Sequence, residues 1–292
     1  MMCRLDPKGI AILGFVVSVC LVGQVTSKLT HRTREQLYNL LGNRHMVNKQ
    51  TQFLNVPPGG VALELLAKDC RAAYLRGRRQ SGVYVIHPKN SPPLAVYCDL
   101  TSDGWIVLQK NTLNKETLWS HNWSQYKEGF GNLTGDHWLG NEMIHLLTRQ
   151  NPFTVMFSVV DHHGVRRHAT YSSFNVDNED HSYTLRLGDY SGDAGDALTV
   201  TNETGIHDNM KFSTADRDND RWVRNCAEVN KGGWWFDSCS SALFNSDLRI
   251  EWRGLCDEKH PCTSSSIMIK PSRKNCLSPG IKHPINILPY TA

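Results

Sequence analysis

The sequence lacks the features that identify most enzymes and nucleic-acid-binding proteins. It contains no H-E-x-x-H, G-x-S-x-G or Walker motif, so we expect a non-catalytic protein. The formal charge of +4 is small and spread along the chain, which gives no case for nucleic-acid binding. Collagen-like glycine triplets, internal repeats and sustained heptads are also absent. The 40% hydrophobic content and eight tryptophans nevertheless suffice for a substantial core.

The apolar run near the N-terminus is too short for a stable membrane span. After Arg4 and Lys8 come about fourteen mostly apolar residues, where a span needs about 20. Val25 and Ser27 then suit the −3 and −1 positions of a signal-peptidase site. We therefore predict a secretory signal peptide at 1–27 and an extracellular protein, with a type II signal anchor as the alternative.

Composition divides the remainder of the chain into three parts. Residues 28–60 show helix-like apolar spacing and end in Pro-Pro-Gly-Gly, which predicts a short helical segment and a linker. From 61 to 275, short runs of β-branched and aromatic residues alternate with turn formers and predict one domain. Residues 276–292 are left as a tail.

Within this domain the pattern indicates an α+β fold with a mainly antiparallel sheet. Runs rich in β-branched and aromatic residues predict strands at 81–88, 94–100, 104–110 and 153–161. Helices are predicted at 66–77, around Cys70, and at 139–150, which stops before Pro152.

Sequons and cysteines agree with a secreted protein. The N-x-S/T sequons that predict glycosylation are Asn122, Asn132 and Asn202. Removal of the signal peptide takes Cys3 and Cys20 and leaves an odd number of cysteines. In an oxidising compartment this implies disulfides and one spare thiol, which could link two chains into a homodimer.

Several clusters resemble reactive sites but have simpler interpretations. Cys256 and Cys262 enclose His260 in CDEKHPC, yet no second ligand pair lies nearby in the sequence. A small disulfide loop is therefore expected, although the pairing of Cys256, Cys262 and Cys276 stays open. The histidines in DHHGVRRHA (His162, His163 and His168) are expected in a hairpin turn. The aspartates of YSGDAGD (Asp193 and Asp196) are expected in a structural turn.

The most informative polar stretch is FSTADRDNDRWVRNCA, residues 212–227, which we call the acidic loop. Asp216, Asp218 and Asp220 alternate, so two or three carboxylates can converge on a hard cation. An EF-hand is excluded because its sixth and twelfth positions would be Arg221 and Ala227. From this pattern alone, a metal site and a self-bonded Asp/Asn-rich turn are equally open.

Ordered motifs between about residues 67 and 270 resemble the fibrinogen C-terminal domain family. The chain is similar to its small secreted fibrinogen-like and angiopoietin-like members. The motifs that carry the resemblance are Asp69-Cys70, SGVYVIHP, VYCDL, GWIVLQK, YKEGFGN, WLGNE, YSGDAGDAL, FSTADRDND and NCAEVNKGGWWFDSC.

The resemblance implies an α+β fold with short helices, long calcium-binding loops and particular site residues. The Ca²⁺ ligands would be the side chains of Asp218 and Asp220 and the backbone oxygens of Trp222 and Arg224. Arg217, Arg221 and Arg224 could neutralise neighbouring carboxylates and weaken calcium affinity. The implied disulfides are Cys70 with Cys98 and Cys226 with Cys239, with GGWWFD packed beneath the acidic loop. In the family's lectins the peptide equivalent to Asn225-Cys226 is cis, a point that sequence does not decide.

The small-ligand pocket of the family is where the sequence departs most from the resemblance. The stretch after Cys239 is shortened, Ser240 and Ser241 stand where sugar-binding members often have histidine, and Val229-Asn230 replaces the polar-acidic pair of fibrinogen's peptide-binding hole. We therefore expect a non-catalytic ligand for an extracellular protein or cell-surface receptor. The alternatives are a calcium-dependent lectin for acetylated glycans and a matrix or clot-associated component.

Overall fold

The computed structural model describes residues 66–200, 205–256 and 259–272. The predicted signal peptide, the 28–60 segment, Asn202, Cys276 and the tail lie outside the described residues. Within the described ranges, every helix is too short or too polar to cross a lipid bilayer.

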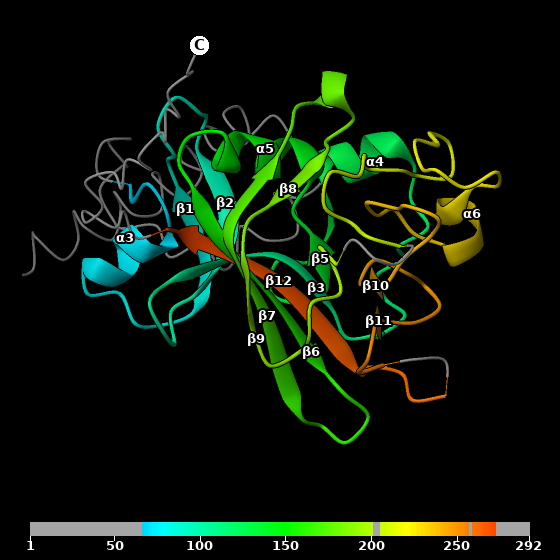
Figure 1. Cartoon of the computed structure of the whole chain (residues 1–292). Helices are drawn as coiled ribbons and strands as arrows, with labels where there is room; N and C mark the ends of the chain where they lie inside the picture. The colour runs from blue at the N-terminus through cyan, green and yellow to red at the C-terminus, as the bar shows by residue number, and fades with distance from the viewer. Residues whose placement is uncertain (1–65, 201–204, 257–258, 273–292) are drawn as a thin grey trace, which may run out of the picture.

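A large antiparallel sheet occupies the middle of the described structure (Figure 1). Its strand order is β1-β2-β3-β12-β6-β7-β8, with β4, β5 and β9 paired at its sides. The strands are β1 (Gly82–Ile86), β2 (Leu94–Asp99), β3 (Trp105–Asn111), β4 (Phe130–Gly131), β5 (His137–Trp138), β6 (Phe153–Val160), β7 (Arg166–Val176), β8 (Leu185–Leu187), β9 (Tyr190–Gly192) and β12 (Ser264–Pro271). A separate two-stranded sheet pairs β10 (Ala242–Leu243) with β11 (Glu251–Trp252).

The last described strand, β12, lies in the centre of the main sheet. Its residues pair with β3 on one side and with β6 on the other, so the sheet joins segments more than a hundred residues apart. The predicted strands at 81–88, 94–100, 104–110 and 153–161 correspond to β1, β2, β3 and β6, with small shifts at their ends.

The helices are short, and their side-chain caps explain where several of them begin. They are α3 (Cys70–Leu75), α4 (Trp123–Glu128), α5 (Asn141–Thr148), α6 (Cys226–Asn230) and the 3₁₀ helix η3 (Glu179–His181). The helix predicted at 66–77 is shorter in the structure. It begins at Cys70, because the Asp69 side chain caps its start by accepting a hydrogen bond from Ala72 N (2.6 Å), and Gly77, at φ +91°, follows its end. Helix α4 is too short to show a helical period in the sequence and was not predicted, although it carries a capping box from Asn122 to Gln125.

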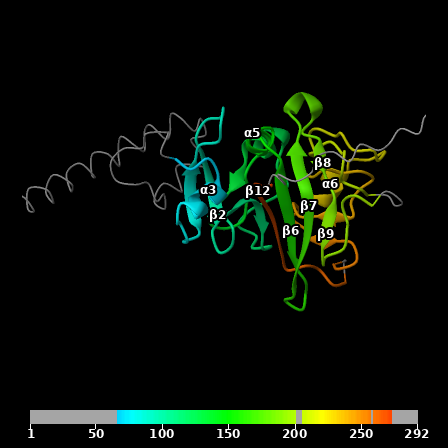
Figure 2. The same ribbon diagram turned by 60° about the vertical axis from the view of Figure 1, so that its left-hand side comes forward.

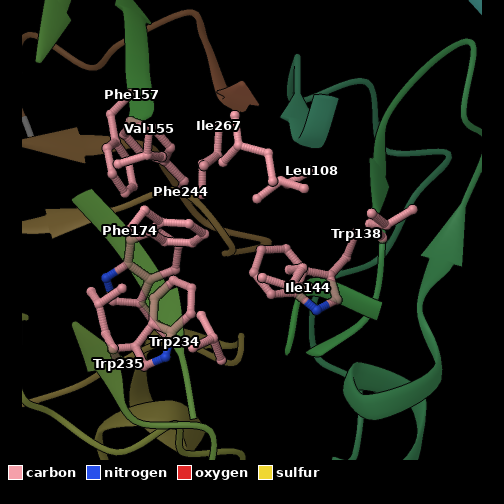
Figure 3. Packing of buried hydrophobic residues seen from close by; sticks show 14 of the residues in the cluster. Leu108, Trp138, Ile144, Val155, Phe157, Phe174, Trp234, Trp235, Phe244 and Ile267 are labelled. Carbon is pink, nitrogen blue, oxygen red and sulfur yellow. The ribbon is translucent and has the colours of Figure 1, made fainter. Parts of the chain in front are cut away.

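Aromatic side chains fill the core between the sheet and the long loops. Figure 3 shows Phe157 and Phe174, from β6 and β7, gathered with Trp234 and Trp235 of the GGWWFD segment. Both tryptophans are buried, and their rings meet edge to face with centroids 5.2 Å apart. Removing such rings from water is a dominant favourable term in folding, so this cluster anchors the loops that follow β9.

Disulfides join Cys70 to Cys98, Cys226 to Cys239 and Cys256 to Cys262. The first connects α3 to β2, and the second connects α6 to the end of the GGWWFD segment. A cis peptide bond is present at Ser238–Cys239, whereas Asn225–Cys226 is not among the cis bonds of the described residues.

Candidate functional site

Main-chain contacts hold the acidic loop directly above the buried tryptophans. Ser213 and Trp234 exchange two backbone hydrogen bonds, with N–O distances of 2.9 and 3.2 Å. The Asn219 side chain donates to the carbonyl of Phe212 at 2.8 Å, and its backbone N donates to the Ser213 hydroxyl at 3.0 Å. The start of the loop is therefore fixed by the core.

Asp216 has a structural role that distinguishes it from the other two aspartates. Its Oδ1 accepts hydrogen bonds from the backbone N of Trp123 at 2.9 Å and from the Thr214 hydroxyl at 2.7 Å. Trp123 is the first residue of α4, so Asp216 ties the acidic loop to this helix. The D-x-D-x-D pattern alone could not separate this aspartate from its neighbours.

Asp218 and Asp220 lie side by side in the middle of the loop. Asp218 Oδ1 accepts from Asp220 N at 3.1 Å, and Asp220 Oδ1 accepts from Trp222 N at 2.8 Å. The other oxygen of Asp220 accepts from Cys226 N at 2.8 Å. Partial burial raises the pKa of Asp220, and the adjacent negative charge of Asp218 adds to this rise. Two carboxylates this close favour a positive charge between them.

Two backbone oxygens complete the set that the family resemblance implies. Within the described part of the chain, the carbonyls of Trp222 and Arg224 accept no hydrogen bond from the protein. Carboxylate and carbonyl oxygens are the ligand types that Ca²⁺ prefers. The described residues contain no group of three or more His, Cys, Asp or Glu side chains arranged for a metal, so a cation here would depend on both carboxylates and carbonyls.

The arginines of the loop do not pair with these two carboxylates. Arg217 lies over the ring of Trp123, 3.9 Å from its centroid, and forms an ion pair with Glu179 at 3.6 Å. Arg221 forms an ion pair with Asp237, and the Arg224 guanidinium lies 5.8 Å from the ring centroid of Trp222. Arg217 and Arg221 thus pair with the neighbouring carboxylates of Glu179 and Asp237 rather than with Asp218 or Asp220.

Glu179 connects η3, α4 and the acidic loop. It accepts a hydrogen bond from Trp123 Nε1 at 2.7 Å and pairs with Lys127 and Arg217. The hydrogen bond from Lys127, followed by that from Trp123, holds the pKa of Glu179 below its usual range. This network fixes the relative positions of the loop and α4.

Ser241, at a position where sugar-binding members of the family often have histidine, forms hydrogen bonds within the protein. Ser241 is buried, and both its backbone N (3.0 Å) and its hydroxyl (2.5 Å) donate to the carbonyl of Gly205. Beside it, buried His207 accepts at Nε2 from the backbone N of Ser241 and Ala242, each at 3.1 Å, and donates from Nδ1 to the Trp235 carbonyl at 2.7 Å. Burial lowers the pKa of His207 to about 4, so its imidazole is neutral at pH 7.

Val229 and Asn230 also differ from a ligand-binding pair. The Asn230 side chain is buried and donates to the carbonyl of Cys226 at 2.9 Å, while the backbone carbonyl of Asn230 accepts from the Ser246 hydroxyl at 2.6 Å. Val229 is 54% exposed, and Val223 near the acidic loop's end is 96% exposed. This end of the domain therefore exposes Val223 and Val229, whereas the Asn230 side chain bonds internally.

A cavity of about 350 Å³ lies elsewhere in the structure. It is lined mainly by residues at the ends of α3, α5, β6 and β12. Arg71 and Phe153 belong to this lining, and Figures 1 and 2 show α3 and α6 at opposite ends of the described fold. The cavity is thus separate from the acidic loop.

Comparison with known proteins decides the family. A family model described as "Fibrinogen beta and gamma chains, C-terminal globular domain" matches residues 66–268. The chain belongs to this family. It is 44% identical over 215 residues to "Fibrinogen-like protein 1-like protein" of Gallus gallus, covering 72% of this chain and 75% of that protein. It is 41% identical over 226 residues to "Techylectin-5A" of Tachypleus tridentatus, covering 72% and 75% respectively.

Solved fibrinogen C-terminal domains share the fold. The "Fibrinogen-like globe domain of human ANGPTL2" has a TM-score of 0.63 at 33% identity, over 70% of this chain and 99% of that domain. The predicted α+β class with a mostly antiparallel sheet and short helices is confirmed. Fibrinogen-like and angiopoietin-like relatives form a class of non-catalytic, extracellular proteins of the ligand type.

The fibrinogen-like sequence pattern located the acidic loop but not all the residues that shape it. Asp193 accepts from His168 N at 2.7 Å and Asp196 from the Tyr171 hydroxyl at 2.8 Å, so both aspartates tie their turn to strand β7. The role of His207 was missed, because its partners Trp235 and Ser241 come from later segments. A lone histidine between Gly205 and the acidic loop carries no periodic signal that could have revealed it.

Two of the three sequons lie within the described residues, and their side chains are exposed. Asn122 is the N-cap of α4, with its side-chain oxygen accepting from Gln125 N at 2.9 Å. Asn132 forms a turn in which its oxygen accepts from Thr134 N at 3.0 Å and from the Thr134 hydroxyl at 2.8 Å. Glycosylation at either position stays a prediction.

Proposed function

We propose that this fibrinogen C-terminal domain protein is a secreted, calcium-binding ligand that recognises a protein on cell surfaces without catalysis. The observation that carries this proposal is the closure of the small-ligand position, where Ser241 is buried and bonded to Gly205. Val223 and Val229 remain exposed at the same end of the domain, which favours recognition by a surface.

Calcium would be held by the carboxylates of Asp218 and Asp220 and the carbonyls of Trp222 and Arg224. The ion would supply positive charge beside two adjacent carboxylates that repel each other. Both carbonyls belong to the segment that carries exposed Val223. Calcium would therefore fix the backbone on which the recognition surface is built.

Binding of labelled, full-length protein to cells tests this function. We expect Val223→Asp and Val229→Asp to weaken binding, because a charge would replace apolar contact area. Leu75→Asp is the matched control, since Leu75 is 71% exposed on α3 at the opposite end of the domain. Protease treatment of the cells should abolish binding, and chelation should reduce it. Equal binding by all three variants would overturn the proposal.

A lectin is the second candidate, and the likeness to "Techylectin-5A" supports it. Acetylated and non-acetylated resins distinguish the two functions. Retention on acetylated resin alone, released by free acetylated sugar, would favour the lectin. Passage through both resins, with cell binding retained, would favour protein recognition.

A further inference from the structure

Exposed histidines from two distant parts of the sequence meet beside the main sheet. His162 and His163 lie at the tip of the β6–β7 hairpin, and His260 lies in the Cys256–Cys262 disulfide loop. The ring centroids of His162 and His260 are 5.0 Å apart, and those of His162 and His163 are 3.8 Å apart. Figures 1 and 2 both show the hairpin end beside the loop that enters β12.

Hydrogen bonds hold the backbone beneath these rings. Thr263 N donates to the carbonyl of Val160 at 2.8 Å, which joins the disulfide loop to the base of the hairpin. Asp161 N donates to the carbonyl of Val165 at 3.0 Å, and Asp161 Oδ1 accepts from His163 N at 2.9 Å, which closes the hairpin turn. The two histidine-bearing loops are therefore held together by the main chain of the fold.

The distance between ring centroids suits metal binding in the His162–His260 pair but not in the His162–His163 pair. A Zn–N bond of about 2.0–2.1 Å puts a ring centroid about 3.1 Å from the ion, so two tetrahedral imidazole ligands have centroids about 5 Å apart. The His162–His260 separation matches this value. The shorter distance between the His162 and His163 centroids corresponds to too narrow an angle between two ligands at the ion.

We propose that His162 and His260 bind a divalent transition-metal ion of the zinc type, which bridges the hairpin and the disulfide loop. Cys256 and Cys262 are bonded to each other, which leaves imidazole nitrogen as the donor. The described residues contain no metal-site group of three or more His, Cys, Asp or Glu, so the proposal rests on these two protein ligands. Nitrogen ligands separate this site from the oxygen-lined acidic loop, which suits Ca²⁺.

Zinc titration of the full-length protein, with Ca²⁺ present throughout, tests the site. Zn²⁺ binding, measured by calorimetry, should weaken about tenfold or more in His162→Ala and in His260→Ala, because each loses one of two protein ligands. His163→Ala is the matched control and should stay within about threefold of the wild type. The affinity of the site for other divalent ions should rise from Mn²⁺ through Co²⁺ and Ni²⁺ to Cu²⁺, while Mg²⁺ should not compete with zinc.

A second measurement separates loss of the site from loss of folding. Melting temperatures without zinc should agree among the wild type and the three variants, whereas added zinc should raise that of the wild type and His163→Ala alone. Unchanged zinc affinity in both His162→Ala and His260→Ala would overturn the proposal. An equal loss of affinity in His163→Ala would also overturn it, because the pairing would then be wrong.

Discussion

Asp220 Oδ2 accepts a hydrogen bond from the backbone N of Cys226 at 2.8 Å, which joins the middle of the acidic loop to the first residue of α6. Its other oxygen accepts from Trp222 N, so one carboxylate organises the backbone on both sides of Val223 and Arg224. In the proposed calcium site the same carboxylate would contact the ion, which would link metal binding to the shape of the exposed segment.

Asp218→Asn provides the cleanest test of calcium binding. The amide oxygen can still accept from Asp220 N, but the negative charge is lost. We expect calcium affinity to fall while the metal-free protein stays folded. Calcium at a hundred times its Kd should stabilise the wild type by about 2.7 kcal/mol, and thermal melting should reveal the loss of this increment.

Asp216→Asn is the matched control for that experiment. Asp216 accepts from Trp123 N and the Thr214 hydroxyl, and the amide oxygen of asparagine can still accept both hydrogen bonds. Since Asp216 is not among the proposed calcium ligands, calcium affinity should be unchanged. A wild-type calcium response in Asp218→Asn would argue against the ligand assignment.

The buried histidines predict a loss of stability in mild acid. His207 has a folded pKa of about 4, below the unfolded value of about 6.5, so the unfolded chain takes up a proton first as pH falls. The free energy of unfolding should be constant above about pH 7 and should decrease by up to roughly 3 kcal/mol as pH falls through this window. Burial also lowers the pKa of His137, which acts in the same direction.

His207→Ala tests this assignment through the pH slope. The variant loses three hydrogen bonds and should be less stable at every pH, but its free energy of unfolding should change less between pH 7 and 5. Denaturant melts at several pH values measure both effects. Identical slopes in the wild type and variant would show that another group titrates.

Gly232 has no room for a side chain. A Cβ at this position would lie 1.9 Å from the carbonyl oxygen of Asn245, which is backbone and cannot rotate away. Gly232→Ala should cost about 3 kcal/mol or more of stability. Gly82→Ala is the control, because a Cβ there meets nothing within 4 Å, and its effect should stay within about 1 kcal/mol. Chemical denaturation compares the two.

The capping and glycosylation roles of Asn122 can be separated. Ser124→Ala removes the sequon and leaves the Asn122 cap, so a glycan-dependent gel shift should disappear. Adding Asn122→Ala to that variant should then cost about 1 kcal/mol, because the cap is lost while glycosylation is already absent. If the single and double variants are equally stable, the cap contributes nothing measurable.

Local patterns in the sequence predicted the individual strands, because alternation and turn formers identify β1, β2, β3 and β6 without tertiary information. The motif order predicted the family. The contacts of His162 with His260, and of His207 with Trp235, could not be predicted, because they depend on how distant loops meet. Within the acidic loop, sequence proposed Asp218 and Asp220 but not the destinations of its arginines, which are set by Trp123, Glu179 and Asp237.

The central position of β12 affects how this protein can be made. Until residues 264–271 leave the ribosome, β3 and β6 each lack a neighbour on one edge, and unpaired edges recruit other chains. The middle of the sheet can therefore close only after β12 has been made, and a chain terminated before Ser264 would leave β3 and β6 each with an unpaired edge. Completion of the central sheet thus depends on the last described strand.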